Sequence, residues 1–333
     1  MFHQRTLFVV GAGASEEVGL PLGAGLANNI AAKMDISFEH GYVFVGTGDQ
    51  SLYEQLLNAR RQDGDQWFFA AKRLRDGLPF AQSIDDFLDQ RRTDKFVNLY
   101  GKSAICKAIL EAEKASKLFF NPFEGHNPFE VGPIQDTWFV KFMYMLCKGI
   151  PRENVSQIFK NIGFIVFNYD RCIEQFLISS LERAYSIKRE DAVALVNGLD
   201  ILHPYGSVGS LRDIQFGATA LNCVSLAERI KTYTEQADDQ TILKKIQDRV
   251  EASERIVFLG FAYHSQNMLM LQAATGEATK IVYGTAYGMS GPDVTEVHKL
   301  ISRTIRPREI HIENKLKCAG LFEHYAKSLS GGD

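Results

Sequence analysis

The chain has 333 residues, of which 45% are hydrophobic and 23% are charged, and its formal net charge is −3. This is the composition of an ordinary globular protein, long enough to bury a large core or to form two lobes. The slight negative charge argues against a dedicated nucleic-acid surface, although a local basic patch would be compatible with it.

Cysteine usage and hydropathy further narrow the class of protein. The five cysteines stand singly, with no Cys-x-x-Cys pair and no histidine at metal-ligand spacing, so we expect neither a zinc module nor a bound metal. We also find no signal peptide and no apolar run long enough to span a bilayer. These features predict a cytoplasmic protein with reduced cysteines and no membrane contact.

The first predicted element is a short strand, Leu7 to Val10, followed by a glycine turn and a helix over residues 23–34. Gly11 and Gly13 allow close approaches that a β-carbon would block, and a following helix offers unpaired N–H groups to a phosphate. A nucleotide pyrophosphate is therefore the expected ligand. Because Glu16 occupies the third glycine position of the usual Gly-x-Gly-x-x-Gly pattern, a tight turn without a ligand remains the alternative.

A mostly helical stretch comes next, in which apolar residues recur at spacings of three and four between glycines, prolines and asparagines. The expected helices cover residues 53–61, 67–78, 84–92 and 102–120. Within the third of them, we expect Asp85 and Asp86 to lie on a solvated helix face, with one carboxylate possible as a pocket residue. We interpret residues 37–159 as a helical insertion.

Strands and helices alternate again after the insertion. The strand-to-helix pattern occurs in residues 163–185, 255–274, 280–301 and 308–329, with a short strand in 200–206 and helices over 225–236 and 241–254. Short apolar strands alternating with helices predict a parallel sheet that is covered on both faces.

The expected fold class is therefore α/β, a doubly wound, Rossmann-like parallel sheet with a helical insertion. Residues 1–36 and 160–333 would form the sheet domain. In such a fold the ligand binds beyond the carboxyl ends of the strands.

Five short motifs mark the ends of the predicted strands: GAGAS followed by GLP, FNYD, LHPYGS, FLGFAYHSQN and YGTAYGMS. In their order and spacing they resemble the sirtuin-like NAD-hydrolase family of bacterial anti-phage defence. The resemblance covers residues 1–29 and 162–330, and the insertion matches loosely through SIDDFL at 83–88. It implies that the sheet domain binds NAD as a substrate.

The resemblance also assigns roles to the first two motifs. It implies that Gly11, Ala12, Gly13 and Ser15 hold the pyrophosphate and ribose of NAD, and that Pro21 closes the nicotinamide side.

In FNYD, the resemblance implies that Asn168 orients the nicotinamide ribose and an attacking water, with Asp170 as its supporting carboxylate. The same residues also fit a polar strand end that caps the helix starting at Arg171, because aspartate is a favoured helix cap. For Asp170 the two interpretations are equally open, whereas for Asn168 we prefer the catalytic role.

The LHPYGS motif departs from the family pattern. The family's catalytic histidine stands directly before a glycine, but here Tyr205 precedes Gly206 and His203 lies two positions earlier. Either His203 is the base from a slightly shifted turn, or Tyr205 has replaced the histidine and hydrolysis is weak or absent. Side chains two residues apart in an extended segment point to the same side. This favours His203 as the catalytic base and Tyr205 as a cofactor-binding residue.

The last two motifs are implied to contact the adenosine half of NAD. Gly260 would approach it closely, His264 and Asn267 lie just after the same strand, and Thr285 and Tyr287 lie near the adenine by the same logic.

Cleavage of the nicotinamide glycosidic bond builds positive charge on the ribose, so the site must position a water and accept a proton. The related deacetylases normally carry a four-cysteine zinc module, which this chain lacks. We therefore predict an NAD hydrolase that releases nicotinamide and ADP-ribose. It would deplete NAD in anti-phage defence under the control of a protein partner or of homo-oligomerisation. The alternative is a catalytically weak module that binds NAD or ADP-ribose and regulates a partner protein. The choice between NAD and NADP stays open.

Overall fold

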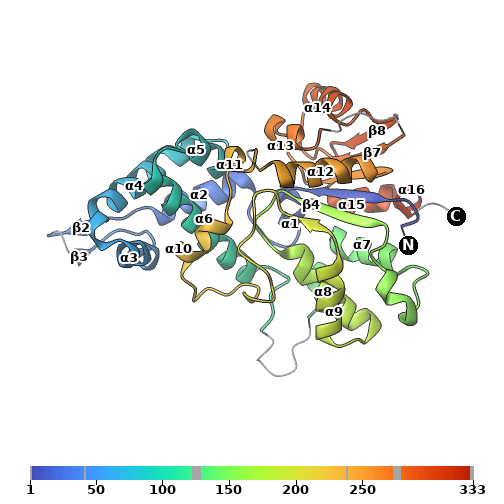
Figure 1. The fold of residues 1–333 in the computed structure, drawn as a ribbon, viewed down its shortest axis with the longest axis horizontal. Helices are drawn as coiled ribbons and strands as arrows, with labels where there is room; N and C mark the ends of the chain where they lie inside the picture. The colour runs from blue at the N-terminus through green and yellow to red at the C-terminus, as the bar shows by residue number, and fades with distance from the viewer. Residues whose placement is uncertain (1, 41–42, 122–128, 238, 273–278, 331–333) are drawn as a thin grey trace.

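A six-stranded, wholly parallel sheet forms the centre of the protein, as the computed structural model shows for residues 2–40, 43–121, 129–237, 239–272 and 279–330 (Figure 1). Its strands are β1 (Thr6–Val10), β4 (Ile162–Val166), β5 (Ile201–Leu202), β6 (Arg255–Leu259), β7 (Ile281–Thr285) and β8 (Glu309–Glu313).

The strands lie in the order β5-β4-β1-β6-β7-β8. Numbered along the chain within this sheet, the order is 3-2-1-4-5-6, which is the order of a Rossmann fold. The expected doubly wound, Rossmann-like architecture is thus confirmed. The strand order reverses beside β1, where Val10 pairs with Val166 on one side and Leu259 on the other. Ligands of such sheets bind at this switch point, beyond the carboxyl ends of the strands.

Both faces of the sheet are covered, which is why every residue of β1 is buried. Phe8 and Val10 point to one face and Leu7 and Val9 to the other. Phe8 stacks on Phe164 with ring centroids 5.1 Å apart. The first face packs with α7 (Trp138–Cys147), α8 (Cys172–Tyr185) and α15 (Cys318–His324), and the second with α12 (Gln240–Ala252) and α14 (Gly291–Thr304).

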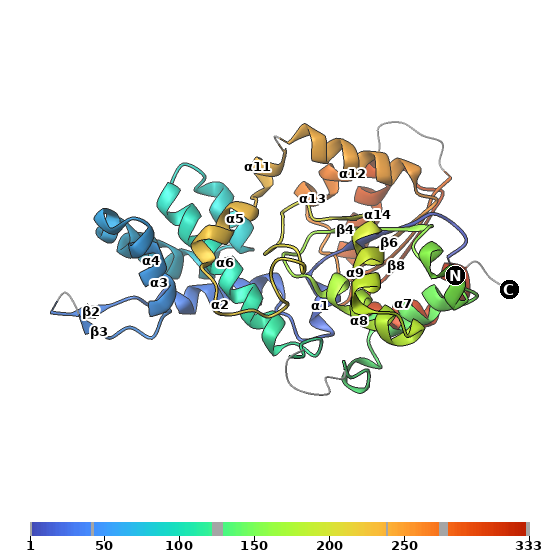
Figure 2. The same cartoon turned by 60° about the horizontal axis from the view of Figure 1, so that its bottom comes forward.

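A second group of helices, which we call the helical lobe, lies to one side of the sheet in both views (Figures 1 and 2). The long helix α6 contacts several of the others. The lobe consists of α2 (Gly23–Lys33), α3 (Gln50–Ala59), α4 (Gly64–Gly77), α5 (Ile84–Gln90), α6 (Lys95–Ala115), α10 (Cys223–Leu226) and α11 (Tyr233–Ala237), with the hairpin of β2 (Phe38–Glu39) and β3 (Val43–Phe44).

The predicted insertion, residues 37–159, does not pack as one unit. Helix α7 lies within this range but packs on the sheet against α15, because its apolar residues Trp138, Phe139 and Phe142 join the core of the first face. Conversely, α2, α10 and α11 come from outside the range and join the helical lobe.

The predicted helix over residues 225–236 is interrupted. Ile230 has extended torsions, and the N–H of Lys231 donates to the carbonyl of Tyr205 over 3.0 Å. This hydrogen bond to the loop after β5 replaces the helical bonding that the apolar spacing suggested.

The remaining elements are short, apart from α9. They are α1 (Ala12–Glu16), α9 (Arg189–Gly198), α13 (Ser265–Met270), α16 (Ala326–Ser330) and the 3-10 turns η1 (Arg61–Asp63), η2 (Leu78–Phe80), η3 (Gly132–Ile134), η4 (Arg152–Gln157) and η5 (Ala227–Arg229). Among the helices of the described ranges, none has the length and apolar character needed to cross a membrane.

A buried ion pair joins the helical lobe to the sheet. Glu113 on α6 and Arg171 just before α8 are 0% and 1% exposed, and the Nε of Arg171 donates to Glu113 over 3.0 Å. Arg171 also donates to the carbonyls of Gly209 and Ile214, and Glu113 accepts the N–H of Gly217. These bonds compensate the loss of hydration of two buried charges.

Glu113→Gln would leave Arg171 as an unpaired buried charge, so we expect a loss of about 3–5 kcal/mol in the free energy of unfolding. The matched control is Glu182→Gln, whose partner Arg189 is 38% exposed while Glu182 is 42% exposed; its loss is expected below about 1 kcal/mol. Urea unfolding measures both, and equal losses would contradict the structural role of the buried pair.

Candidate functional site

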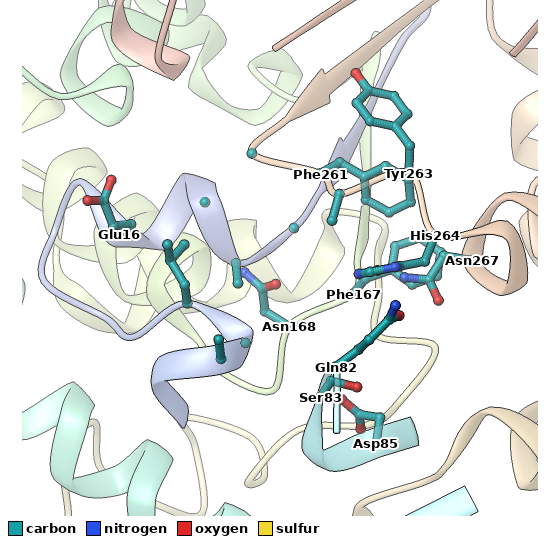
Figure 3. A pocket seen from close by; sticks show the side chains of 18 of the residues that line it. Glu16, Gln82, Ser83, Asp85, Phe167, Asn168, Phe261, Tyr263, His264 and Asn267 are labelled. Carbon is teal, nitrogen blue, oxygen red and sulfur yellow. The ribbon is translucent and has the colours of Figure 1, made fainter. Parts of the chain in front are cut away.

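A cavity of about 900 Å³ opens at the switch point of the sheet. It lies at the carboxyl ends of β1, β4, β6 and β7, and α5 of the helical lobe contributes the facing wall (Figure 3). Its volume is in the range of small-molecule and cofactor sites. We call it the switch-point cavity. The predicted site residues that line it are Gly11, Ala12, Gly13, Asn168, Tyr205, Gly260, His264, Asn267, Thr285 and Tyr287.

Four predicted site residues do not line this cavity. Ser15 and Asp170 are buried and are hydrogen-bonded within the protein, and His203 is bonded to Glu174 on α8. Pro21 lines a separate cavity of about 360 Å³ that α6 helps to form.

The glycine turn packs directly on the turn after β6. The N–H of Gly11 donates to Leu259 O over 2.9 Å, and the N–H of Gly13 donates to Gly260 O over 3.0 Å. A β-carbon on Gly13 would stand 2.9 Å from the α-carbon of Gly260. The glycines are therefore required by the contact between the two turns, which neither interpretation of the motif predicted.

Within the glycine turn, Ala12 keeps a free donor. No described residue accepts a hydrogen bond from its N–H, and Ala12 lines the switch-point cavity. The turn thus offers a ligand one backbone donor at this position.

Asn168 is held at the end of β4 by a directed chain of hydrogen bonds. The hydroxyl of Ser15 donates to Oδ1 of Asp170 over 3.1 Å. That hydroxyl has a single hydrogen, so the atom of Asn168 that contacts it, 3.2 Å away, must be the donating Nδ2. The amide orientation is thereby fixed. No described residue hydrogen-bonds to Oδ1 of Asn168, which leaves this oxygen as an acceptor for a ligand or water.

The carboxylate of Asp170 bonds both to the start of α8 and to Ser15. Its Oδ1 accepts the backbone N–H of Cys172, the first residue of α8, over 3.1 Å, and it also accepts the Ser15 hydroxyl. Burial raises the pKa of Asp170, although the hydrogen bonds from Cys172 and Ser15 oppose this shift. Asp170 therefore caps the helix and orients the Ser15 hydroxyl that supports Asn168.

His203 uses both ring nitrogens within the protein. Nδ1 lies 3.2 Å from Asn168 O, which can only accept, so Nδ1 carries a hydrogen. Nε2 lies 2.9 Å from Oε1 of Glu174. Burial lowers the pKa of His203, but the Glu174 carboxylate and the Asn168 carbonyl outweigh it and hold the pKa above its ordinary value. Burial likewise raises the pKa of Glu174, and the charge and hydrogen bond of His203 bring it below its ordinary value. Both ring nitrogens of His203 are therefore engaged within the protein, outside the lining of the cavity.

The expectation that His203 and Tyr205 point to the same side is wrong. The N–H of Gly206 donates to His203 O over 3.0 Å, so the segment is a turn rather than an extended strand. Pro204 stands at the second position of this turn, where proline is favoured. Tyr205 consequently lines the cavity, where its hydroxyl donates to Oδ1 of Asn267.

The helical lobe supplies residues that the sequence did not assign to the site, among them Gln82, Ser83 and Tyr233. Asp85 and Asp86 also line the cavity, so the alternative of a pocket carboxylate agrees with the structure. The Asp85 carboxylate accepts the hydroxyl of Tyr169, and burial raises the pKa of Asp85 to about 6, against the lowering effect of that hydrogen bond. The SIDDFL segment was the available sequence signal for this wall.

Glu174, in the first turn of α8, was also missed. Within the described parts of the chain, no group of three or more His, Cys, Asp or Glu side chains is placed to hold a metal ion.

The chain matches no protein-family model and no curated protein. Function must therefore be inferred from the geometry of the site.

Gly260→Ala should destabilise the fold. Gly260 has a φ of +55°, and a β-carbon there would overlap the backbone of Gly13 and Ala14, so we expect a loss of at least about 2 kcal/mol in the free energy of unfolding. Gly198→Ala, at the end of α9 with open space around it, is the control and should be neutral or slightly stabilising. Thermal unfolding tests this, and equal melting temperatures for wild type and Gly260→Ala would contradict the close contact.

The His203–Glu174 pair should make stability depend on pH. Folding raises the pKa of His203, so its contribution is complete below the ordinary value of 6.5 and is lost as the pH rises through the higher folded value. Folding lowers the pKa of Glu174, so its contribution is complete above 4.5 and is lost as the pH falls through the lower folded value. The difference in the free energy of unfolding between wild type and Glu174→Gln, measured with urea, should therefore be largest between about pH 4.5 and 6.5 and smaller at about pH 9. A difference that does not change with pH would show that the pair is not ionised.

Proposed function

We propose that the protein is an NAD hydrolase that releases nicotinamide and ADP-ribose from NAD bound in the switch-point cavity. The observation that carries this proposal is the fixed amide of Asn168 at the end of β4. Its Nδ2 is engaged by Ser15, and no described residue occupies its Oδ1. It lines a cavity of cofactor size at the place where Rossmann-like folds bind nucleotides.

The lining of the cavity offers groups that suit parts of NAD. The free N–H of Ala12 in the glycine turn can donate to a pyrophosphate oxygen. Lys317 also lines the cavity, where its Nζ forms an ion pair with Oε2 of Glu16 at 3.0 Å. Aromatic side chains offer surfaces for the bases, namely Phe167, Tyr205, Tyr233, Phe261, Tyr263 and Tyr287.

The charges of the cavity also suit glycosidic cleavage. As nicotinamide leaves, positive charge develops on the ribose. The carboxylates of Asp85 and Asp86 line the cavity, and carboxylate charge favours such a transition state. The neutral amide of Asn168 can accept a hydrogen bond from the attacking water or a ribose hydroxyl, and so fix the geometry without adding charge.

A binding module remains the second candidate, because one specific observation favours it. His203 has both ring nitrogens engaged and lies outside the cavity, so the histidine expected as the base is not placed to take a proton from bound water. In that case the protein would hold NAD or ADP-ribose in the switch-point cavity and regulate a partner protein.

The biological setting that we propose follows from the motif resemblance described above. The enzyme would deplete NAD during phage infection. Because uncontrolled NAD loss is toxic, a protein partner or homo-oligomerisation would restrain the activity.

Asn168→Ala should reduce nicotinamide release by at least about 100-fold, since it removes the group that positions the reacting ribose and water. Asn197→Ala, at an exposed position on α9, is the matched control and should keep wild-type turnover. Chromatographic measurement of nicotinamide after incubation with NAD decides this. Turnover retained by a folded Asn168→Ala protein would remove the residue from the site, and nucleotide binding without wild-type turnover would favour the binding module.

A further inference from the structure

We infer that His264, rather than His203, accepts the proton of the attacking water. This inference rests on the proposed NAD hydrolysis and assigns the base that the reaction requires. It places His264 at the nicotinamide ribose rather than at the adenosine half that the motif resemblance implied. Histidine is the side chain most often used for proton transfer near neutral pH. Within the described lining of the switch-point cavity, His264 is the single histidine.

The side chain of His264 is exposed and belongs to the turn between β6 and α13. Figure 3 shows its imidazole extending into the cavity on the side where Asn168 lies, with Gln82 of the helical lobe on the facing wall. Asn168 on the turn after β4 and His264 on the turn after β6 thus line the same cavity, and we place the attacking water between them.

The ring nitrogens of His264 and His203 differ in their hydrogen-bond partners. No described residue forms a hydrogen bond or an ion pair with its imidazole, whereas both nitrogens of His203 are engaged. A neutral imidazole always keeps one nitrogen with a lone pair. At His264 that lone pair is available to a water in the cavity.

A residue with a strained backbone stands directly before His264. Tyr263, directly before His264, has a φ of +56°, a left-handed conformation that is costly for a bulky residue, by about 1–3 kcal/mol. Its hydroxyl donates to Thr285 O over 3.1 Å, and its ring packs on Phe258 and Phe261 with centroids 5.2 and 5.4 Å away. These contacts hold the unusual conformation of Tyr263, which sets the course of the backbone at His264. Strain of this kind is concentrated at functional sites.

The proposed step balances with water as the only co-reactant. The bond from ribose C1′ to the nicotinamide nitrogen breaks, and its electron pair leaves with the nicotinamide. The oxygen of water bonds to C1′, and one proton of that water passes to the free nitrogen of His264. The proton then leaves to solvent, so NAD⁺ and water give nicotinamide, ADP-ribose and one H⁺. Asn168 holds the water or the ribose through its Oδ1.

The test compares His264→Ala and His264→Gln with wild type, by nicotinamide release and by calorimetry of ADP-ribose binding. Loss of the base should lower kcat by about 10²- to 10⁴-fold in both variants, with ADP-ribose affinity changed only a few-fold. Added imidazole should restore part of the turnover of His264→Ala, which a merely structural role would not allow. His298→Gln on α14, outside the cavity, is the matched control and should behave as wild type.

The possible failures are distinguishable. If wild type hydrolyses NAD and the His264 variants keep its kcat, this inference is overturned and the proposed function stands. The inference is also overturned if imidazole rescues His203→Ala but not His264→Ala, or if lost ADP-ribose affinity explains the whole defect. If wild type releases no nicotinamide in any oligomeric state and in the presence of its partner, the proposed function is overturned and the role of His264 with it.

Discussion

The contact between the turn after β1 and the turn after β6 is the constraint on which the site depends. Gly13 and Gly260 bring two backbones together where a β-carbon on either would collide with the other chain segment. The contact packs the two turns together at the switch point of the sheet, where both line the cavity. It also places the left-handed turn that follows β6, and with it the aromatic residues and the histidine that line one wall. The two packed turns thus form a wall of the cavity before a ligand binds.

A second constraint is a set of buried hydrogen bonds that connects the glycine turn with the helical lobe. Ser15 links Asn168 to Asp170, and Arg171, the next residue, is bound to Glu113 of the lobe. The amide that would position the reacting ribose is thus tied by short buried bonds to both parts of the molecule. The lobe in turn places acidic side chains opposite that amide, so the site requires both parts.

Much of the sheet could be predicted from the sequence, because strands buried on both faces must be short apolar runs between helices. The packing of α7 on the sheet could not, since its apolar spacing fits a helix in either part of the molecule. At the site, the glycine turn and Asn168 were predicted to lie at the strand ends, where the structure places them. The direction of His203 was mistaken because Pro204 makes a turn out of a segment that was treated as extended. Its partner Glu174 is distant in sequence, and only the folded chain brings the two together.

A crystal structure of the protein with ADP-ribose would show whether the nucleotide binds at Asn168. We expect electron density in the switch-point cavity, with the pyrophosphate at Ala12 and the terminal ribose within hydrogen-bonding distance of Oδ1 of Asn168. Nucleotide bound elsewhere on the protein, or bound here with the terminal ribose turned away from Asn168, would contradict this expectation.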